Sequence, residues 1–302
     1  MEKLNMRKIY LLIFIILFAI SSTVAVVQMD FSKVEIKATK VAGSVYMVAG
    51  ADDAAAFSGG NIAVSVGDDG VLMVDAKFAQ LSDKIKTAIK EIGGDAPKYI
   101  VNTHEHGDHV SGNVGFSKTG TVVAHTNVRN SLKTEQPAEA WPVITFDNSM
   151  SFYMNGDEIQ VNHYPKGHTD GDAIIFFKTA NVIHMGDHFF HKLFPFVDLD
   201  NGGSVQGYMD NVKKVIDHAT ADVKIIPGHG PLATLDDLKS FYQMLQETTT
   251  LITDKMKAGK SLEAIKAESL PEKYASLSWY FITTERWIET IYNSYKSEIT
   301  KK

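Results

Sequence analysis

Three histidines and one aspartate stand within six positions of one short segment, VNTHEHGDHVSGN (residues 101–113). Only 11 of the 302 residues are histidine, so this density at fixed spacing is unusual for a solvated loop. In extended chain, His104 and His106 point their rings the same way. Asp108 and His109 follow, where a turn can aim them at a second point. A catalytic zinc ion takes about three protein ligands and keeps one open position. The segment therefore predicts the start of two metal sites.

The remaining ligands should come from other loops at strand ends, preferably loops that contain glycine. His168 stands between glycines in KGHTDGD, just before an apolar strand-like run. Asp187 follows a predicted strand in HMGDHFF, and His229 lies in the constrained turn PGHGP. These three residues are the candidate ligands outside the first cluster.

Six other histidines are assigned no metal-binding role. His188 and His191 follow Asp187 in a long aromatic-rich loop, and we expect them at the surface or in the wall of a cleft. Four more are expected to be structural or exposed: His125, His163, His184 and His218. The loop's phenylalanines either form an apolar wall for substrate or pack as ordinary loop residues, and the sequence leaves this open for Phe189, Phe190, Phe194 and Phe196.

The N-terminus has the order of a secretory signal. A basic segment, MEKLNMRK, precedes the apolar run IYLLIFIILFAI (9–20) and the small residues SSTVA. We predict a signal peptide over residues 1–25 and a periplasmic or secreted protein. The alternative is an uncleaved N-terminal anchor, because the apolar run is borderline for a membrane span. The chain has no cysteine, which excludes a disulfide scaffold and a cysteine-linked lipid anchor.

Composition limits the partners. The chain is 44% hydrophobic and 22% charged, with a net charge of −6 and a pI of about 6.0. Such a chain has no basic field to attract nucleic acid or an anionic membrane surface. A small-molecule substrate is the expected partner, and the sequence indicates no oligomeric state.

The elements that must position the ligands form two similar halves. Residues 61–76 predict a hairpin that turns at 67–70, and a helix follows over 80–94 with Ser82 as its cap. A buried strand, KYIVNT, then leads into the histidine cluster. A hairpin over 173–187, a helix over 205–220 and the strand VKIIPGHG repeat this order. Two halves packed face to face, with helices outside, would bring their strand-end loops to one edge, where ligands usually bind.

After Pro231 the pattern becomes helical. Helices are predicted over 235–259 and 283–299, with a shorter one in SLEAIKAE between them. An aromatic stripe is predicted to pack this region onto the main domain, and it consists of Trp279, Tyr280, Phe281, Trp287 and Tyr292.

Taken together, the motifs resemble the metallo-β-lactamase fold superfamily, whose signature is H-x-H-x-D-H followed downstream by His, Asp and His. The resemblance covers roughly residues 40–235. It implies a mixed α/β (α+β) fold, a four-layer αβ/βα sandwich with C-terminal helices and the site at one edge of two sheets. The expected domains are 33–235 for the family-like domain and 236–302 for a helical extension packed on it.

The resemblance also implies the ligand set and a cofactor of two zinc ions, with iron as a possible substitute. One ion would be held by His104, His106 and His168, and the other by Asp108, His109 and His229. Asp187 would bridge the two ions. Asp75, the counterpart of Asp187 in the first half, would be buried and accept hydrogen bonds from the histidine loop.

The implied function is that of a dinuclear zinc hydrolase, and the N-terminal sequence predicts that it is exported. A metal-bridging hydroxide would attack an ester, thioester, lactone, amide or phosphoester bond, because metal binding lowers the pKa of water toward about 7. Asp108 is the expected catalytic residue: it would orient the hydroxide and pass its proton to the leaving group.

Three alternatives stay open. The first is a β-lactamase-like enzyme, although Asp187 differs from the arrangement of true lactamases, one subclass of which has Cys there. The second is an iron persulfide dioxygenase-like enzyme, and the third is a binding protein with an inactive site, against which the full ligand set argues. Glyoxalase II proper is disfavoured, because its glutathione substrate is cytosolic and this chain carries an export signal.

Overall fold

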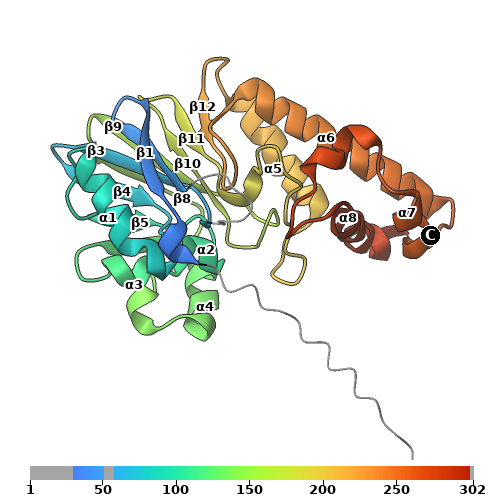
Figure 1. Cartoon of the computed structure of the whole chain (residues 1–302), viewed down its shortest axis with the longest axis horizontal. Helices are drawn as coiled ribbons and strands as arrows, with labels where there is room; N and C mark the ends of the chain where they lie inside the picture. Colours follow the sequence, from blue (N-terminus) through green and yellow to red (C-terminus); the bar gives the residue numbers. More distant parts are fainter. Residues whose placement is uncertain (1–29, 51–57, 300–302) are drawn as a thin grey trace, which may run out of the picture.

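A computed structural model describes residues 30–50 and 58–299, and its main body consists of four layers (Figure 1). Two sheets lie face to face. The first has seven strands in the order β1-β2-β3-β4-β5-β6-β7, and the second has six in the order β13-β12-β11-β10-β9-β8. In Figure 1, α1 covers the sheet pair on the left, and α5 and α6 cover it on the right. The predicted αβ/βα sandwich is confirmed.

The first sheet consists of β1 Ile36–Ala42, β2 Val45–Gly50, β3 Ile62–Gly67, β4 Gly70–Val74, β5 Tyr99–Val101, β6 Thr121–His125 and β7 Ile144–Phe146. The second consists of β8 Ser149–Met154, β9 Asp157–His163, β10 Ala173–Phe177, β11 Val182–His184, β12 Lys224–Ile226 and β13 Ala233–Thr234. The helices are α1 Ser82–Glu91, α2 Gly107–Val110, α3 Asn113–Phe116, α4 Thr126–Glu135, α5 Val205–His218, α6 Leu235–Lys257, α7 Leu262–Glu268 and α8 Thr284–Ile299.

Both halves follow the same construction. Strands β3 and β4 form an antiparallel hairpin, and β4 pairs in parallel with β5 after the crossover through α1. In the second sheet, β10 and β11 form the hairpin, and β11 pairs in parallel with β12 after α5. Parallel neighbours end at the same sheet edge, so this repeated order brings the loops after β5, β11 and β12 together.

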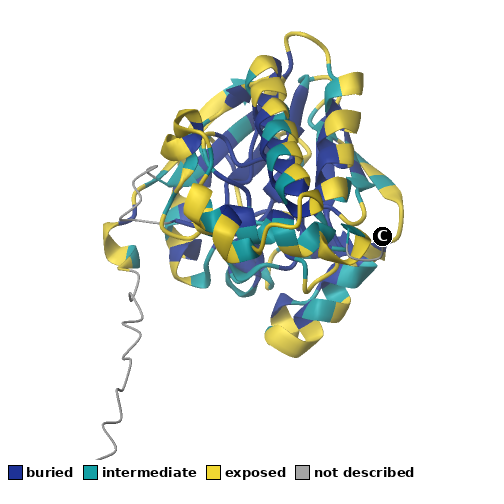
Figure 2. Ribbon diagram, turned by 90° about the vertical axis from the view of Figure 1, so that its right-hand side faces the viewer, coloured by how far each residue is buried: buried dark blue, intermediate teal, exposed yellow. Residues whose placement is uncertain are grey.

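The space between the sheets is filled by aliphatic side chains from both. Leu72, Val101 and Val123 of the first sheet belong to the same buried cluster as Val161 and Ile175 of the second. Burial of this face is roughly worth 25 cal/mol per Å² of apolar surface. In Figure 2 the helices turn buried residues inward and exposed residues outward, as amphipathic helices on a sandwich should.

Helix α1 buries Ile85, Ala88 and Ile89 at the spacing of an amphipathic helix, but the prediction that Ser82 caps it is wrong. Ser82 has helical dihedral angles and is the first residue of the helix. Its hydroxyl donates to the carbonyl of Ala79 at 2.8 Å. The physical reason is that a 3₁₀ turn leads directly into α1, so the chain has no extended residue at the capping position.

The C-terminal helices extend the helical layer outside the second sheet: α6 packs beside α5, and α8 packs on α6 and α5. Helix α6 begins with a capping box formed by Thr234 and Asp237. Trp287 of α8 is fully buried and donates its indole N–H to Thr248 at 3.2 Å. The predicted aromatic stripe is therefore only partly a packing element. Trp287 is in the core, whereas Tyr280 is 57% and Phe281 38% exposed.

The predicted signal peptide, residues 1–25, and its anchor alternative lie outside the described residues. Among the helices that the structure describes, none combines the length and apolar character needed to cross a bilayer. The boundary at 235/236 stays a prediction; α6 begins at Leu235.

Candidate metal centre

The candidate ligands lie on loops and short turns at one edge of the two sheets. His104 and His106 follow β5, and Asp108 and His109 lie on the short helix α2. The others come from three further segments: His168 from the β9–β10 loop, Asp187 from the 3₁₀ turn after β11, and His229 from the loop after β12. All seven predicted residues are brought together there.

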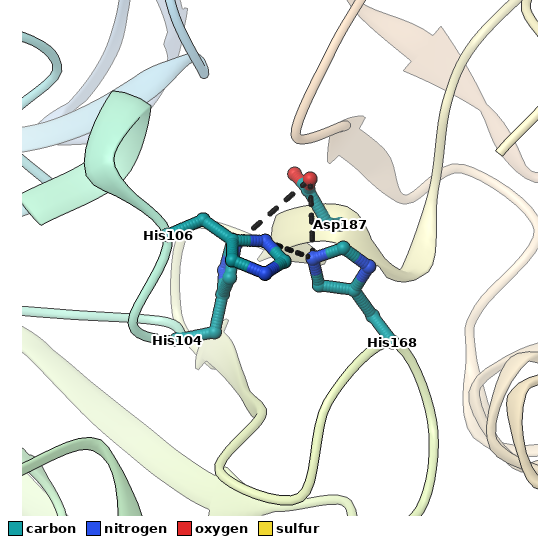
Figure 3. A group of neighbouring side chains, drawn as sticks. All are labelled: His104, His106, His168 and Asp187. Atoms are coloured by element: carbon teal, nitrogen blue, oxygen red, sulfur yellow. Dashed lines mark hydrogen bonds and ion pairs between the residues drawn. The ribbon is translucent and has the colours of Figure 1, made fainter. Parts of the chain in front are cut away.

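The first group consists of His104, His106, His168 and Asp187, whose nearest ligand atoms all lie within 4.8 Å of one another (Figure 3). His168 Nε2 and His106 Nδ1 are 2.8 Å apart. His104 and His168 are buried, and His106 is partly buried. These donors suit a metal ion that prefers nitrogen and oxygen ligands.

The second group consists of Asp108, His109 and His229, again within 4.8 Å. Here Nε2 of His229 lies 3.3 Å from Asp108 Oδ2 and 3.4 Å from His109 Nε2. Asp108 is the more exposed of the two ligand carboxylates, with 18% of its side chain accessible against 4% for Asp187.

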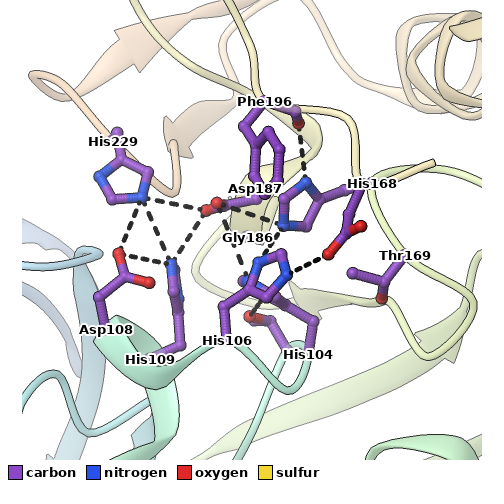
Figure 4. A network of polar contacts seen from close by, with 12 residues as sticks. His104, His106, Asp108, His109, His168, Thr169, Gly186, Asp187, Phe196 and His229 are labelled. Atoms are coloured by element: carbon purple, nitrogen blue, oxygen red, sulfur yellow. Dashed lines mark hydrogen bonds and ion pairs between the residues drawn. The ribbon is translucent and has the colours of Figure 1, made fainter. Parts of the chain in front are cut away.

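Asp187 lies between the groups, as Figure 4 shows. Its Oδ1 is 3.1 Å from His109 Nε2 and 3.4 Å from His229 Nε2. Its Oδ2 is 3.5 Å from His168 Nε2 and 3.9 Å from His104 Nε2. Each carboxylate oxygen thus faces a different group, which is the geometry of a bridging ligand.

Hydrogen bonds on the far side fix the ring orientations of four histidines. His168 Nδ1 donates to the Phe196 carbonyl at 2.8 Å, and His106 Nε2 donates to Asp198 at 2.8 Å. A proton on the outer nitrogen leaves the inner nitrogen with a free lone pair, so we assign these tautomers from the network.

Asp75 fixes the other two rings. It is fully buried, and one of its oxygens accepts from the backbone N–H of Thr103 and the other from the Thr103 hydroxyl, both at 2.8 Å. His109 Nδ1 donates to the same carboxylate at 2.8 Å. The Thr103 oxygen can then accept from His104 Nδ1 at 2.9 Å. Asp75 thus accepts the hydrogen bonds from the histidine loop that were predicted, and it holds a left-handed backbone, with φ of 64°, to do so.

The charges of this buried cluster favour a cation. Burial raises the pKa of Asp187, but the surrounding histidines, His109 first, outweigh burial and hold that pKa well below its usual range. Asp108 behaves likewise, with a pKa of about 2. Burial lowers the pKa of His168 to about 3 and that of His104 well below its usual value. Two carboxylates therefore stand among imidazoles, of which His104 and His168 are neutral, whereas Asp187 outweighs burial and raises the pKa of His109 and of His229.

Two buried atoms show whether a metal ion would fit the site. Among the described residues, neither His104 Nε2 nor Asp187 Oδ1 has a hydrogen-bond partner. A buried polar atom without a partner costs about 1–3 kcal/mol, and both atoms face into their groups. Donor types, tautomers and charge all fit a pair of divalent metal ions.

Backbone closes one side of the centre. A Cβ at Gly60 would collide with the His109 ring, and a Cβ at Gly228 would collide with Asp187 Oδ1. The fully buried Lys77 holds the first of these segments, since its ammonium donates to the carbonyls of Gly60 at 2.6 Å and Gly59 at 3.1 Å. Because Gly60 and Gly228 have no side chain, their backbone packs directly against His109 and Asp187.

The predictions for the other histidines need one correction. His188 and His191 are 1% and 8% exposed, so they are not surface residues. His188 lies 3.2 Å from the Asn211 amide nitrogen, and His191 Nδ1 donates to the Pro231 carbonyl at 2.9 Å. Neither belongs to the two metal groups. The aromatic loop folds back under α5 and α6, and this buries both rings.

Sequence reasoning missed several supporting residues. Asp198, Thr103 and Lys77 hold the ligands or the segment against them, and the sequence carries no signal that separates Asp198 from the nearby Asp200. Only the fold shows that the loop after Phe196 passes beside His106. The buried Lys77 is a violation of normal burial preferences that a single sequence cannot reveal.

A comparison with known families matches residues 56–229 to the sequence profile described as "Metallo-beta-lactamase superfamily". The chain belongs to the metallo-beta-lactamase superfamily. Relatives of the chain in this superfamily are metal-dependent hydrolases. The matched region includes all seven candidate ligands.

One curated member of the superfamily is the metallo-beta-lactamase type 2 of Elizabethkingia meningoseptica, which is 30% identical over 128 residues. That alignment covers 41% of this chain and 49% of the relative, so it spans about half the length of that lactamase.

Three solved structures of the superfamily have the same fold. A metallo-beta-lactamase from Pontibacter korlensis gives a TM-score of 0.61 at 16% identity, covering 70% of this chain and 99% of that one. The DIM-1 metallo-beta-lactamase gives 0.59 at 16%, covering 71% and 99%. A double mutant of the sec-alkyl sulfatase PisA1 gives 0.66 at 15%, covering 86% of this chain and 50% of that one.

The bridging position of Asp187 generates the first prediction. Asp187→Asn keeps the size of the side chain but removes its charge, so two dications would repel each other with less compensation. We expect the ion at Asp108, His109 and His229 to weaken most, by at least 10–100-fold, since losing a supporting residue alone costs that much. Calorimetric titration of zinc into the metal-free variant measures this. Two binding events like those of the wild type would show that Asp187 is not a bridge. The control is Asp157→Asn, because Asp157 is a buried carboxylate that accepts hydrogen bonds in the β10–β11 turn and is not a candidate ligand; this variant should bind zinc like the wild type.

The contact between Asp198 and His106 generates the second prediction. Asp198→Ala removes the acceptor that orients the His106 ring, and we expect zinc at the first group to bind about 10–100-fold more weakly. Competition with a chromophoric chelator gives the affinity. Asp200→Ala, an exposed carboxylate in the same loop, should leave the affinity at the wild-type value. Equal affinities in both variants would contradict the role of Asp198.

Proposed function

We propose that the chain is a dinuclear zinc hydrolase that cleaves an ester-, thioester-, lactone-, amide- or phosphoester-type bond. The observation that carries this proposal is the Asp187 carboxylate, whose two oxygens face two separate groups of ligand atoms. Zinc suits these groups, because imidazole and carboxylate are common zinc ligands and the chain has no thiolate to offer.

Zinc, when bound, supplies a water-derived nucleophile at neutral pH and polarises the carbonyl or phosphoryl group under attack. The protein's part is to hold the reacting groups in place. The histidines keep their inner lone pairs convergent, and the ionised Asp108 and Asp187 offset two of the positive charges of two dications. The positive charge left over when both ions are bound would stabilise an oxyanion that develops on the substrate.

Asp108 is the proposed catalytic residue. It is the more accessible ligand carboxylate, and its pKa of about 2 keeps it ionised at neutral pH. An ionised carboxylate accepts a hydrogen bond from the attacking water and orients it, and it can then pass the proton to the leaving group. A carboxyl group with such a low pKa releases a proton readily at neutral pH, so Asp108 suits orienting the water and passing its proton on, not keeping that proton.

The test is a joint measurement of metal content and activity on protein purified without added metal. We expect two zinc ions per chain and hydrolysis of at least one member of a panel of chromogenic esters, thioesters, lactones, phosphodiesters and β-lactams. Chelation should abolish the activity and added zinc should restore it. The β-lactams test cleavage of an amide bond, and they are included because the chain is similar to a lactamase.

His106→Ala is the matched variant for this test. It removes one ligand of the first ion, so metal content and activity should fall together, while the sandwich core stays folded because the histidine loop lies outside it. One iron per chain with oxygen uptake would replace the hydrolase proposal with the iron oxidoreductase alternative. A metal-free, inactive wild type would support a binding protein instead.

We also propose that the protein is exported to the periplasm or secreted. The support is the order of basic, apolar and small residues in the N-terminal sequence. Expression of the full chain followed by fractionation and intact-mass measurement tests this. A chain outside the cytoplasm that has lost about its first 25 residues is the expected result. A full-length chain in the membrane fraction would favour the anchor alternative, and one in the cytoplasm would contradict export.

A further inference from the structure

An aromatic segment of the C-terminal region crosses the metal centre. Trp279, Tyr280 and Phe281 lie between the 3₁₀ helix Glu272–Leu277 and α8. The Trp279 ring centroid is 6.3 Å from that of His229, a ligand of the second group. At the other end, the Phe281 and Phe196 centroids are 5.2 Å apart.

Phe196 completes the contact with the first group. Its ring centroid lies 5.5 Å from that of His106 and 5.6 Å from that of His168. We call Phe196, Trp279, Tyr280 and Phe281 the aromatic rim. The rim therefore reaches both groups of candidate ligands, although three of its four members lie outside the region matched by the family profile, residues 56–229.

The rim presents apolar surface to solvent. Six large hydrophobic residues of the described chain are exposed, and two of them, Tyr280 at 57% and Phe281 at 38%, belong to the rim. Single exposed hydrophobic residues are ordinary, but an exposed group beside a candidate catalytic centre marks a binding surface.

The rim is held in place by contacts behind it. The Trp279 indole N–H donates to the Phe194 carbonyl at 3.0 Å. Arg286 donates to the Phe281 carbonyl at 2.9 Å, and its guanidinium lies 4.2 Å from the Phe281 centroid and 5.3 Å from that of Phe196. This cation positions both rings by stacking on them. A surface ordered in advance loses little conformational entropy when a ligand packs on it.

The rim also adds no charged side chain to the centre, since it consists of a tryptophan, a tyrosine and two phenylalanines. Tyr280 joins it through Trp279, whose ring centroid lies 5.2 Å from that of Tyr280. The centre therefore combines charged, metal-binding groups with an adjoining uncharged aromatic surface.

We propose that the aromatic rim is the specificity surface of the enzyme, and that its substrates carry an aryl or extended alkyl group next to the scissile bond. This inference rests on the proposed hydrolase function. An apolar group packed on the rim leaves water while the reactive bond reaches the metal centre, and each buried methylene contributes about 0.8 kcal/mol, or roughly fourfold in affinity. Arg286 acts as a positioning residue for Phe196 and Phe281.

The test compares methyl acetate with methyl octanoate, followed by proton release, because neither ester has an aromatic leaving group that could itself occupy the rim. With half of the six extra methylenes buried, we expect kcat/KM for the octanoate to be about 10–100-fold higher, mainly through KM. Phe281→Ala should reduce this ratio about tenfold, and Phe281→Leu should keep most of it. Tyr153→Ala, an exposed aromatic residue 76% accessible on β8, is the matched control and should keep the wild-type ratio.

A binding measurement keeps the two proposals separable. The neutral probe 4-phenyl-1-butanol contains no hydrolysable bond, and its binding is followed by tryptophan fluorescence, to which Trp279 contributes. We expect binding that weakens at least fivefold in Phe281→Ala and is unchanged in Tyr153→Ala.

Binding of this kind without hydrolysis of any ester would support the rim and contradict the hydrolase proposal as it applies to esters. Ester hydrolysis with an octanoate-to-acetate ratio near one, or with the same ratio in Phe281→Ala, would overturn the inference and leave the hydrolase proposal intact. Failure of the wild type to bind the probe would also overturn the inference.

Discussion

The structure depends on keeping imidazole lone pairs turned toward one another in a place that water reaches poorly. His168 Nε2 and His106 Nδ1 are 2.8 Å apart, and the outer nitrogen of each ring donates to a protein oxygen. Two acceptors at this distance repel each other unless a cation lies near both. The hydrogen bonds that the histidines donate to Asp75, Asp198 and the Phe196 carbonyl therefore have a common effect, which is to prevent the rings from turning their N–H groups inward.

The two sheets make this arrangement possible by sharing one edge. Each half ends its parallel strands at that edge, and Asn61, the residue before β3, links the two halves. Its backbone N–H donates to the Gly228 carbonyl at 2.7 Å, and its side-chain amide donates to the carbonyls of Pro227 and Gly230 at 3.0 and 2.8 Å. Asn61 thus ties the first half to the loop that carries His229. The relative position of the two ligand groups is set by these backbone contacts together with the packed core between the sheets.

Much of this could be predicted from the sequence, because the decisive patterns are local. The H-x-H-x-D-H spacing, the β3–β4 hairpin and the amphipathic spacing in α1 depend on near neighbours in the chain, and the structure contains them. What the sequence left open or missed depends on long-range packing. The sequence did not decide whether the phenylalanines after Asp187 pack in the loop or line a cleft, and the structure buries Phe189, Phe190 and Phe194 in the core and leaves Phe196 partly exposed. The role of Asp198 and the placement of residues 279–281 over the centre follow from tertiary contacts between segments far apart in the chain, and periodicity carries no information on these.

The glycine backbone that closes one side of the centre limits which substitutions the protein tolerates there. At Gly60 and Gly228, any side chain would collide with His109 or with Asp187, so point substitutions cannot remodel that side of the centre without damaging it. The aromatic rim consists instead of side chains on a loop and on a C-terminal segment, and none of its members is a candidate ligand. If the rim selects the substrate, as we propose, substitutions there would change which substrates bind while the ligands are kept. Catalysis and substrate selectivity would then change separately in evolution.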